Sequence, residues 1–257
     1  MRKATKIKKS DSTTPLIQLR NLCKSFGKQQ VLNDLHLDVF KNESLVILGR
    51  SGVGKSVLIK CLIGLINPDS GSIRLENNEI SSLSEEERSQ LMSKFGFLFQ
   101  GGALFDSLPV WKNIAFFALH NQKVSAEKAR DIAADKLLKV GLGPEILDRY
   151  PQELSGGMQK RVAFARTIAH NPEILLFDEP TTGLDPTMAR TINELIVKIR
   201  KTMHTTMITI THDLNSTRLV GTRVALLHQG KIAWTGSVKE LDNSHNRTVE
   251  HFIRGEA

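Results

Sequence analysis

Short apolar runs recur along the chain and predict β-strands. The first two runs span 16–22 and 31–40, with a turn around Gly27 between them. The run 44–48 ends directly at Gly49, as a buried parallel strand does. The remaining runs predict strands at 174–177 and 207–210 and a hairpin of 223–227 with 231–234 across Gln229–Gly230.

Helical periodicity fills much of the sequence between these runs. A helix is predicted from Lys55, with Leu58, Leu62 and Leu65 on one face and a stop at 67–71. Ser84 and Glu87 have the spacing of a capping box, which predicts another helix start. Three more helices are predicted, one capped by Ser125 and closing near Gly141, one capped by Ser155 and ending at Asn171–Pro172, and one over 187–203. This alternation predicts an α/β sheet, and the helical stretch 101–165 predicts an insertion into it.

Composition narrows the class of protein. The chain has 257 residues, with 40% hydrophobic and 24% charged, which suits one globular domain carrying an inserted subdomain. The longest apolar candidate, 57–66, is interrupted by Lys60 and is far shorter than the roughly 20 residues that span a bilayer. A role at a membrane would therefore require a partner that provides the membrane span.

Charge and cysteine content add two further points. The net charge of +8 comes in part from a polar, basic segment at 1–15, which lacks the apolar core of a secretory signal. We interpret it as a solvated tail, with weak docking to an acidic membrane surface as the alternative. Cys23 and Cys61 lie far apart inside apolar-patterned elements, so buried thiols are expected rather than a disulfide or metal site, in agreement with a reducing compartment.

A phosphate-binding motif follows the strand 44–48. Residues 49–56 fit the pattern G-x-x-x-x-G-K-[ST] between a strand and a helix. Glycines let backbone N–H groups approach phosphate oxygens, and the helix N-terminus adds partial positive charge. Lys55 is expected on the β- and γ-phosphates of ATP, and the Ser56 hydroxyl on Mg²⁺. The predicted ATP-binding residues of this segment are Gly49, Arg50, Ser51, Gly52, Val53, Gly54, Lys55, Ser56 and Val57.

Two adjacent carboxylates follow the strand 174–177. Asp178 is predicted to hold Mg²⁺ and Glu179 to act as the general base on the attacking water. By itself the pair could simply open a surface turn before Pro180, but its place downstream of a P-loop favours the catalytic interpretation.

A second anion-binding segment is what separates this chain from single-site P-loop kinases and GTPases. It consists of Leu154, Ser155, Gly156, Gly157, Met158 and Gln159, with Ser155 at a helix N-cap. This segment resembles the signature motif of ABC ATPases. The resemblance implies that Ser155 and Gly157 of one subunit contact the γ-phosphate of ATP held by the P-loop of the other, in a homodimer.

Other motifs occur in the order of the same family, over about 16–236. By resemblance, Gln100 is the Q-loop glutamine, which contacts Mg²⁺ and the attacking water, and residues 182–185, ending in Asp185, form the D-loop. His212 is similar to the switch histidine at the γ-phosphate, and Phe26 to the ring that stacks on adenine. Val57 departs from the pattern because many members have a hydroxyl residue there, so we expect weaker nucleotide binding with intact chemistry.

The resemblance also implies an organisation of the chain. The expected fold is that of a P-loop NTPase of the ABC ATPase type, with a mixed central sheet, an N-terminal antiparallel β subdomain and an inserted helical subdomain. Residues 16–98 and 166–240 would form the nucleotide-binding core and 99–165 the helical subdomain. Residues 1–15 and 241–257 would be tails, the second with Val249, Phe252 and Ile253 as apolar positions whose contacts the sequence leaves open.

The stretch 99–116, FQGGALFDSLPVWKNIAF, narrows the expected transport system. It resembles ATPases of the Mla type, which with MCE-domain proteins move phospholipids between the membranes of a diderm envelope. The resemblance implies an integral membrane permease, an MCE-domain partner and a location at the cytoplasmic face of the inner membrane, with no nucleic acid. Two alternatives are an ABC ATPase for import of a small polar solute such as an amino acid, and a non-transport ABC ATPase.

Overall fold

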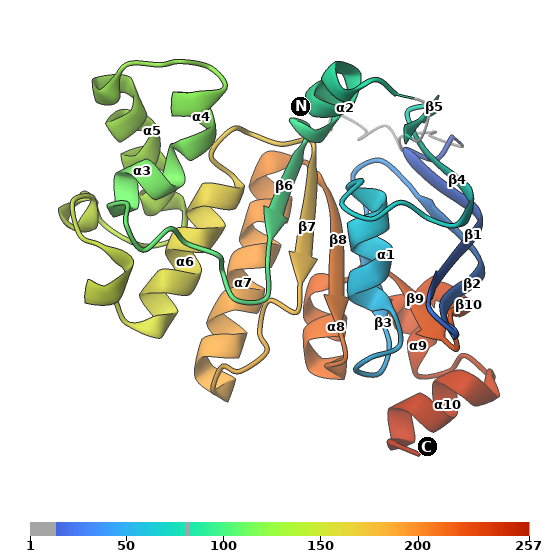
Figure 1. The fold of residues 1–257 in the computed structure, drawn as a ribbon. Coiled ribbons are helices and arrows are strands. Elements are labelled where there is room, and N and C mark those ends of the chain that lie inside the picture. The colour runs from blue at the N-terminus through green and yellow to red at the C-terminus, as the bar shows by residue number, and fades with distance from the viewer. Residues whose placement is uncertain (1–13, 81–82, 257) are drawn as a thin grey trace, which may run out of the picture.

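The computed structural model describes residues 14–80 and 83–256, which form two sheets and a group of helices beside them (Figure 1). Residues 1–13 of the predicted basic tail lie outside the described residues. The strands are β1 (Ile17–Phe26), β2 (Gln29–Val39), β3 (Ser44–Leu48), β4 (Ser70–Leu75), β5 (Asn78–Glu79), β6 (Phe95–Leu98), β7 (Ile174–Asp178), β8 (Thr206–Thr211), β9 (Arg223–His228) and β10 (Lys231–Ser237). The α-helices are α1 (Lys55–Leu62), α2 (Glu85–Met92), α3 (Val110–Ile114), α4 (Phe116–His120), α5 (Ala126–Lys139), α6 (Gly156–Thr167), α7 (Pro186–Met203), α8 (Leu214–Val220), α9 (Val238–Leu241) and α10 (Arg247–Arg254).

The smaller sheet is antiparallel, with strand order β2-β1-β4-β5. Strands β1 and β2 form the predicted hairpin, in register from Ile17 opposite Val39 to Phe26 opposite Gln29. Gly27 in the connecting turn has a φ of 59°, a left-handed conformation that favours glycine. The expected antiparallel β subdomain near the N-terminus is confirmed.

The larger sheet is mixed, with strand order β10-β9-β3-β8-β7-β6. Strands β6, β7, β8, β3 and β9 run parallel, and only β10 pairs antiparallel, on β9. The P-loop strand β3 therefore lies between β8 and β9, and the loops after β3, β6, β7 and β8 all leave from the same edge. This arrangement collects the predicted catalytic residues at the carboxyl ends of the strands.

Both faces of the larger sheet are buried, which explains the uninterrupted apolar runs. Val46 and Leu48 of β3 belong to one core cluster, together with residues of α3, α5, α6 and α7. Leu45 and Ile47 belong to a second cluster, which includes α1 and the antiparallel sheet. Figure 1 shows α3, α4, α5 and α6 grouped at the β6 end of the sheet. No helix in the described part of the chain is both long enough and apolar enough to cross a bilayer.

Two predicted helices end earlier than the sequence suggested. Helix α1 ends at Leu62, and Leu65, expected on its buried face, is 63% exposed. The reason is Gly64, which has a φ of 72°; its N–H donates to Cys61 O and that of Leu65 donates to Lys60 O, as in a Schellman cap. Helix α6 ends at Thr167, several residues before the predicted stop.

The C-terminal segment is partly helical and packs on its own chain. Val249 in α10 is 1% exposed, and Phe252 and Ile253 pack against the first core cluster. The expected boundaries at 98, 165 and 240 stay predictions, although Leu98 ends β6.

Cys61 is expected to resist alkylation in the native protein. Its side chain is 1% exposed, and burial raises the pKa of the thiol to about 11 from an ordinary 9.0, which leaves about a hundred times less thiolate than in a free cysteine. In timed iodoacetamide labelling at pH 8 followed by peptide mass spectrometry, Cys61 should react only after denaturation. Rapid labelling of native Cys61 would contradict its buried position.

Candidate functional site

The P-loop turns from the end of β3 into α1. Gly52 and Gly54 have φ values of 78° and 110°, which residues with a side chain rarely adopt. A Cβ atom on Gly54 would also lie 2.8 Å from Val31 Cγ1, so the loop has no room for one. Since Lys55 opens α1, the backbone N–H groups of the loop and of the first helical turn surround one position suited to phosphate.

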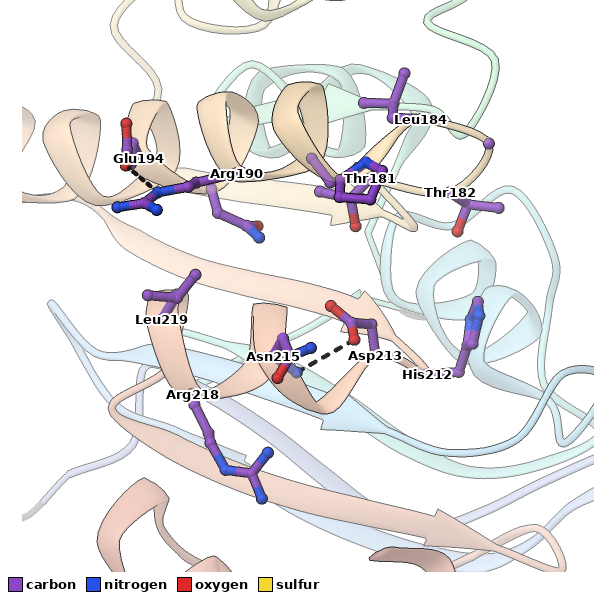
Figure 2. Close-up of a pocket in the computed structure, with 14 residues that line it drawn as sticks. Thr181, Thr182, Leu184, Arg190, Glu194, His212, Asp213, Asn215, Arg218 and Leu219 are labelled. Atoms are coloured by element: carbon purple, nitrogen blue, oxygen red, sulfur yellow. Dashed lines mark hydrogen bonds and ion pairs between the residues drawn. The ribbon is translucent and has the colours of Figure 1, made fainter. Parts of the chain in front are cut away.

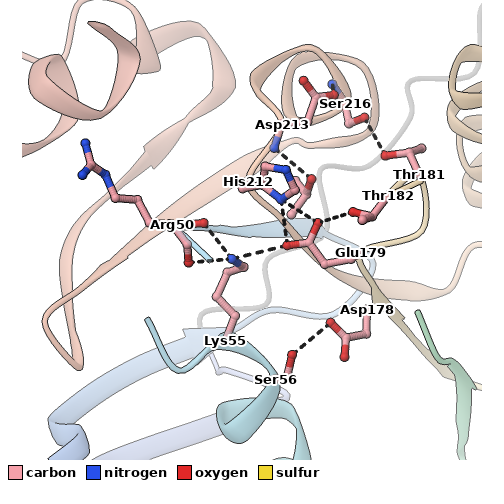
Figure 3. A network of polar contacts seen from close by, with 12 residues as sticks. Arg50, Lys55, Ser56, Asp178, Glu179, Thr181, Thr182, His212, Asp213 and Ser216 are labelled. Carbon is pink, nitrogen blue, oxygen red and sulfur yellow. Dashed lines mark hydrogen bonds and ion pairs between the residues drawn. The ribbon is translucent and has the colours of Figure 1, made fainter. Parts of the chain in front are cut away.

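Lys55 lies at the centre of this loop and is 5% exposed. Its Nζ donates to Gly49 O at 2.7 Å and to Arg50 O at 2.9 Å, and lies 3.3 Å from Glu179 Oε1 (Figure 3). Burial lowers the pKa of the Lys55 amine, and the neighbouring Glu179 carboxylate opposes that shift. The amine is thus held between the loop and the predicted general base.

Glu179 follows β7 directly and has a φ of 47°. This left-handed turn points its carboxylate to two further partners: His212 Nδ1 lies 3.0 Å from Oε2, and Thr182 Oγ1 donates to Oε2 at 2.9 Å (Figure 3). Three groups from three loops therefore fix the orientation of a carboxylate whose side chain is only 11% exposed. That arrangement suits a base which holds one water molecule in line for attack.

Asp178 and Ser56 form a second polar pair beside this network. Ser56 Oγ donates to Asp178 Oδ1 at 3.3 Å, and burial raises the pKa of the Asp178 carboxyl. A hydroxyl and a carboxylate at this distance fit Mg²⁺, which takes few protein ligands and completes its shell with water and substrate phosphate. The described residues contain no cluster of three or more His, Cys, Asp or Glu side chains that could hold a metal ion.

One cavity of about 370 Å³ joins these groups. It is lined by Val31, Ser51, Gly52, Gly54, Lys55, Ser56, Val57, Gln100, Glu179, Thr182 and His212. The structure thus brings together all four residues predicted to be catalytic, from loops after β3, β6, β7 and β8. Val31 was not predicted as a site residue, and its side chain offered no polar signal. Thr182 was predicted only as part of the D-loop, and its hydrogen bond to Glu179 was not predicted.

The remaining predicted site residues are not part of this lining: Gly49, Arg50, Val53, Asp178, Asp185, Phe26 and residues 154–159. Ser155 of the last segment instead caps α6, where its Oγ accepts from Met158 N at 3.3 Å. Phe26 also lies outside the lining and is 49% exposed, with the Lys24 ammonium 5.5 Å from the ring centroid. Arg50 contributes its carbonyl to the loop, but its guanidinium points away from Lys55 (Figure 3). The guanidinium donates to Glu256 O. Any contact of Arg50 with ATP would therefore come from its backbone.

A larger hollow of about 770 Å³ adjoins the cavity and shares Thr182 and His212 with it (Figure 2). Residues 182–184 of the predicted D-loop form one wall, and Asp185, which is not in the lining, caps α7 by accepting from Thr187 N at 2.9 Å and Met188 N at 3.0 Å. Helix α8 forms the opposite wall, with Asn215 and Leu219 facing the space (Figure 2). The cavity with the P-loop is therefore open on the D-loop side.

Comparison with known proteins agrees with this geometry. A family model described as ABC transporter matches residues 32–182, more than half of the chain. The Mycobacterium leprae protein called probable ribonucleotide transport ATP-binding protein mkl is 38% identical over 93% of this chain and 69% of its own length. The Arabidopsis thaliana chloroplastic protein TRIGALACTOSYLDIACYLGLYCEROL 3 is 35% identical, over 93% of this chain and 74% of its own. The Campylobacter jejuni methionine import ATP-binding protein MetN is 36% identical, over 93% and 75%.

A solved structure shares the fold. The ATP-binding cassette MJ0796, described as a dimer in a post-hydrolysis state bound to ADP and Pi, superimposes with a TM-score of 0.78 at 30% identity, over 86% of this chain and 98% of that one. The similarity thus extends over nearly the whole of that cassette.

Proposed function

The chain belongs to the ABC transporter family, as an ATP-hydrolysing subunit, and we propose that it powers phospholipid movement between the two membranes of a diderm cell envelope through a separate permease. It would act as a homodimer at the cytoplasmic face of the inner membrane. The observation that carries the lipid assignment is the sequence of the segment 99–116, which resembles Mla-type ATPases. The loop within this segment leaves the side chain of Phe105 partly exposed.

Asn113 holds this loop in shape. The side chain is fully buried; its Oδ1 accepts from Phe105 N at 2.8 Å, and its Nδ2 donates to Phe105 O at 3.0 Å and Leu108 O at 2.8 Å. Phe105 is 38% exposed, while Leu104 packs against the core. A rigid loop that presents an aromatic ring beside α6 suits a short apolar helix of a permease.

Hydrolysis would take place between two copies. In each copy Lys55 would neutralise charge on the β- and γ-phosphates, and Glu179, oriented by His212 and Thr182, would accept a proton from the attacking water. Ser56, Asp178 and Gln100 would hold Mg²⁺, which supplies further neutralisation of phosphate charge. Residues 154–159 of the second copy would close the site from the D-loop side, which explains why they lie away from the P-loop of their own chain.

The names of similar proteins point to more than one substrate. One relative is named after a galactosyl diacylglycerol, which favours lipid, while others are named for ribonucleotide and methionine transport. Import of a small polar solute is therefore the second candidate, favoured by the 36% identity to the methionine import subunit over 93% of this chain.

Affinity purification of the tagged protein from detergent-solubilised native membranes, with mass spectrometry of proteins and lipids, tests the proposal. A multispanning permease recovered with an MCE-domain protein and phospholipid is the expected result. A permease with a soluble solute-binding protein would overturn the lipid assignment, and nucleic acid or ribosomes without a permease would overturn the transport role.

Replacing Leu104 and Phe105 together by Ala should remove the permease from the purified complex by at least about tenfold, because the loop loses its apolar contact surface. ATP hydrolysis by the free subunit should change less than about twofold. Leu138→Ala is the matched control, since Leu138 is 62% exposed on α5 and distant in sequence from the loop. The single variant Phe105→Ala removes the exposed ring but keeps the packing of Leu104, so it tests permease docking without a change in the core. If the permease is recovered in full with Phe105→Ala and with the double variant, residues 104 and 105 do not form the docking surface.

A further inference from the structure

Three side chains of helix α6 contact carbonyls of the segment that contains Gln100. Lys160 Nζ donates to Gln100 O at 2.5 Å and Arg166 Nη1 to Ala103 O at 2.6 Å. Thr167 Oγ1 lies 3.2 Å from Phe97 O, and its shorter contact is with Ala163 O of its own helix, at 2.8 Å. The three carbonyls are spaced three residues apart along 97–103, so the whole segment is attached to one helix. That same helix begins at the signature segment, with Ser155 as its N-cap.

Lys160 is the buried cation of this set, whereas Arg166 is partly exposed. Lys160 is 8% exposed, and its hydrogen-bond acceptor in the structure is the backbone carbonyl of Gln100. Within the described part of the chain, burial alone accounts for the lowered pKa of the Lys160 amine, and no neighbouring carboxylate offsets it. A buried cation without an acidic partner lowers the stability of the fold. The contact between Lys160 and the Gln100 carbonyl is therefore better explained by a role in function than by a role in stability.

The position of the Gln100 carbonyl, which accepts this hydrogen bond, indicates what that functional role is. The Gln100 carbonyl belongs to the residue that lines the cavity with Lys55, Glu179 and His212. Gly101 and Gly102 follow it, and Gly102 and Ala103 both have left-handed backbones, with φ of 77° and 50°. A segment with two adjacent glycines changes conformation easily unless a side chain from another element holds the peptide group that follows Gln100.

We propose that Lys160 is a positioning residue for ATP hydrolysis: by holding the Gln100 carbonyl, it sets the place of the Gln100 side chain in the cavity and makes it move together with the signature helix. Closure of one copy over ATP in the other would then adjust Gln100 in its own copy. The inference rests on the proposed role of Gln100 at the ATP site.

The Lys160→Met variant of the full-length chain tests the inference. Methionine keeps the length and apolar stem but removes the donor. We expect kcat per active site to fall about tenfold, since a displacement of about 1 Å near the reacting groups has effects of that order or larger, while the KM for ATP changes less than about twofold. Lys160→Arg, which restores a donor, should recover activity to within about threefold of the wild type.

Two further variants make the result decisive. Arg161→Met is the matched control, because Arg161 has the same charge on the same helix but donates to Gly141 O at 3.2 Å, away from Gln100. Gln100→Leu should lower kcat at least as much as Lys160→Met, and the double variant should be no worse than Gln100→Leu alone, because both act through one group.

The kinetic results distinguish the positioning role of Lys160 from the role of Gln100 in hydrolysis. If Gln100→Leu lowers kcat and Lys160→Met does not, the positioning role is wrong while the site stands. If Gln100→Leu leaves kcat unchanged, the role of Gln100 fails and the inference fails with it. If Lys160→Met only lowers the melting temperature and the fraction of active sites, with kcat per site intact and no recovery by Lys160→Arg, Lys160 is purely structural.

Discussion

Glu179→Gln is expected to reduce ATP hydrolysis by roughly 10²- to 10⁴-fold while ATP binding is retained. Glutamine has the same shape and keeps a hydrogen-bonding oxygen for Thr182, but it cannot accept the proton of the attacking water. The neighbouring Lys55 keeps its bonds to Gly49 O at 2.7 Å and Arg50 O at 2.9 Å, so the phosphate-binding loop should remain in place. The measurements are single-turnover hydrolysis and titration with a fluorescent ATP analogue.

The matched control for this variant is Glu173→Gln. Glu173 immediately precedes β7, at the end opposite Glu179, and its carboxylate lies 3.7 Å from Lys94 Nζ on the surface. Hydrolysis by that variant should stay within about twofold of the wild type. Full activity of Glu179→Gln would remove Glu179 from the role of general base and would leave His212 as the next residue to test.

Lys55→Met should weaken ATP binding by about a hundredfold, because each hydrogen bond to a charged group contributes about 1.5–3 kcal/mol. Its hydrolysis should fall at least in proportion. Removal of the amine also leaves Glu179 without its nearest cation, which lies 3.3 Å away. Isothermal titration with ATP measures the affinity, and circular dichroism at the same temperature verifies that the variant is folded.

Lys60→Met provides the comparison, since Lys60 lies on the same helix but is exposed and belongs to its last turn. That variant should bind ATP within about twofold of the wild type. Unchanged affinity in Lys55→Met would mean that the backbone N–H groups of the loop supply nearly all of the phosphate binding.

Prediction from sequence succeeded where a local pattern has one structural solution. An apolar run that ends in a glycine-rich turn and a lysine has few alternatives, so β3, the P-loop and the start of α1 were predicted correctly. The mixed central sheet and the position of Lys55, Gln100, Glu179 and His212 around one cavity agree with the motif-based expectation, whereas the order of strands within the sheet was not predicted.

The missed elements depend on contacts between distant segments. Strand β6 is only four residues long and contains Gly96, where a Cβ would lie 2.4 Å from Thr167 O, so that glycine reflects close packing of α6 rather than a turn. The short helices α8, α9 and α10 rely on caps and on tertiary packing more than on periodicity. Gly64 is a residue that often ends a helix, so the early end of α1 could have been predicted from it. The apolar residues Leu65 and Ile66 that follow continue the helical pattern, which is why the helix was predicted to be longer.

The expected contact of Phe26 with adenine stays a prediction. Its predicted role came entirely from resemblance, and the ring lies exposed at the end of β1, outside the cavity lining. The sequence order of a motif places a residue on an element, but it does not determine how far the side chain lies from the cavity.

The central position of β3 has a consequence for synthesis of the chain. Ser44 pairs with Met207, and Leu45 with Arg223, so both neighbours of the P-loop strand are translated more than 160 residues later. At about 5–20 residues per second, roughly 10 to 30 s pass before those partners leave the ribosome. During that time an apolar strand has two unpaired edges, which makes the nascent chain a substrate for chaperones, whereas the β1–β2 hairpin can fold as soon as it emerges.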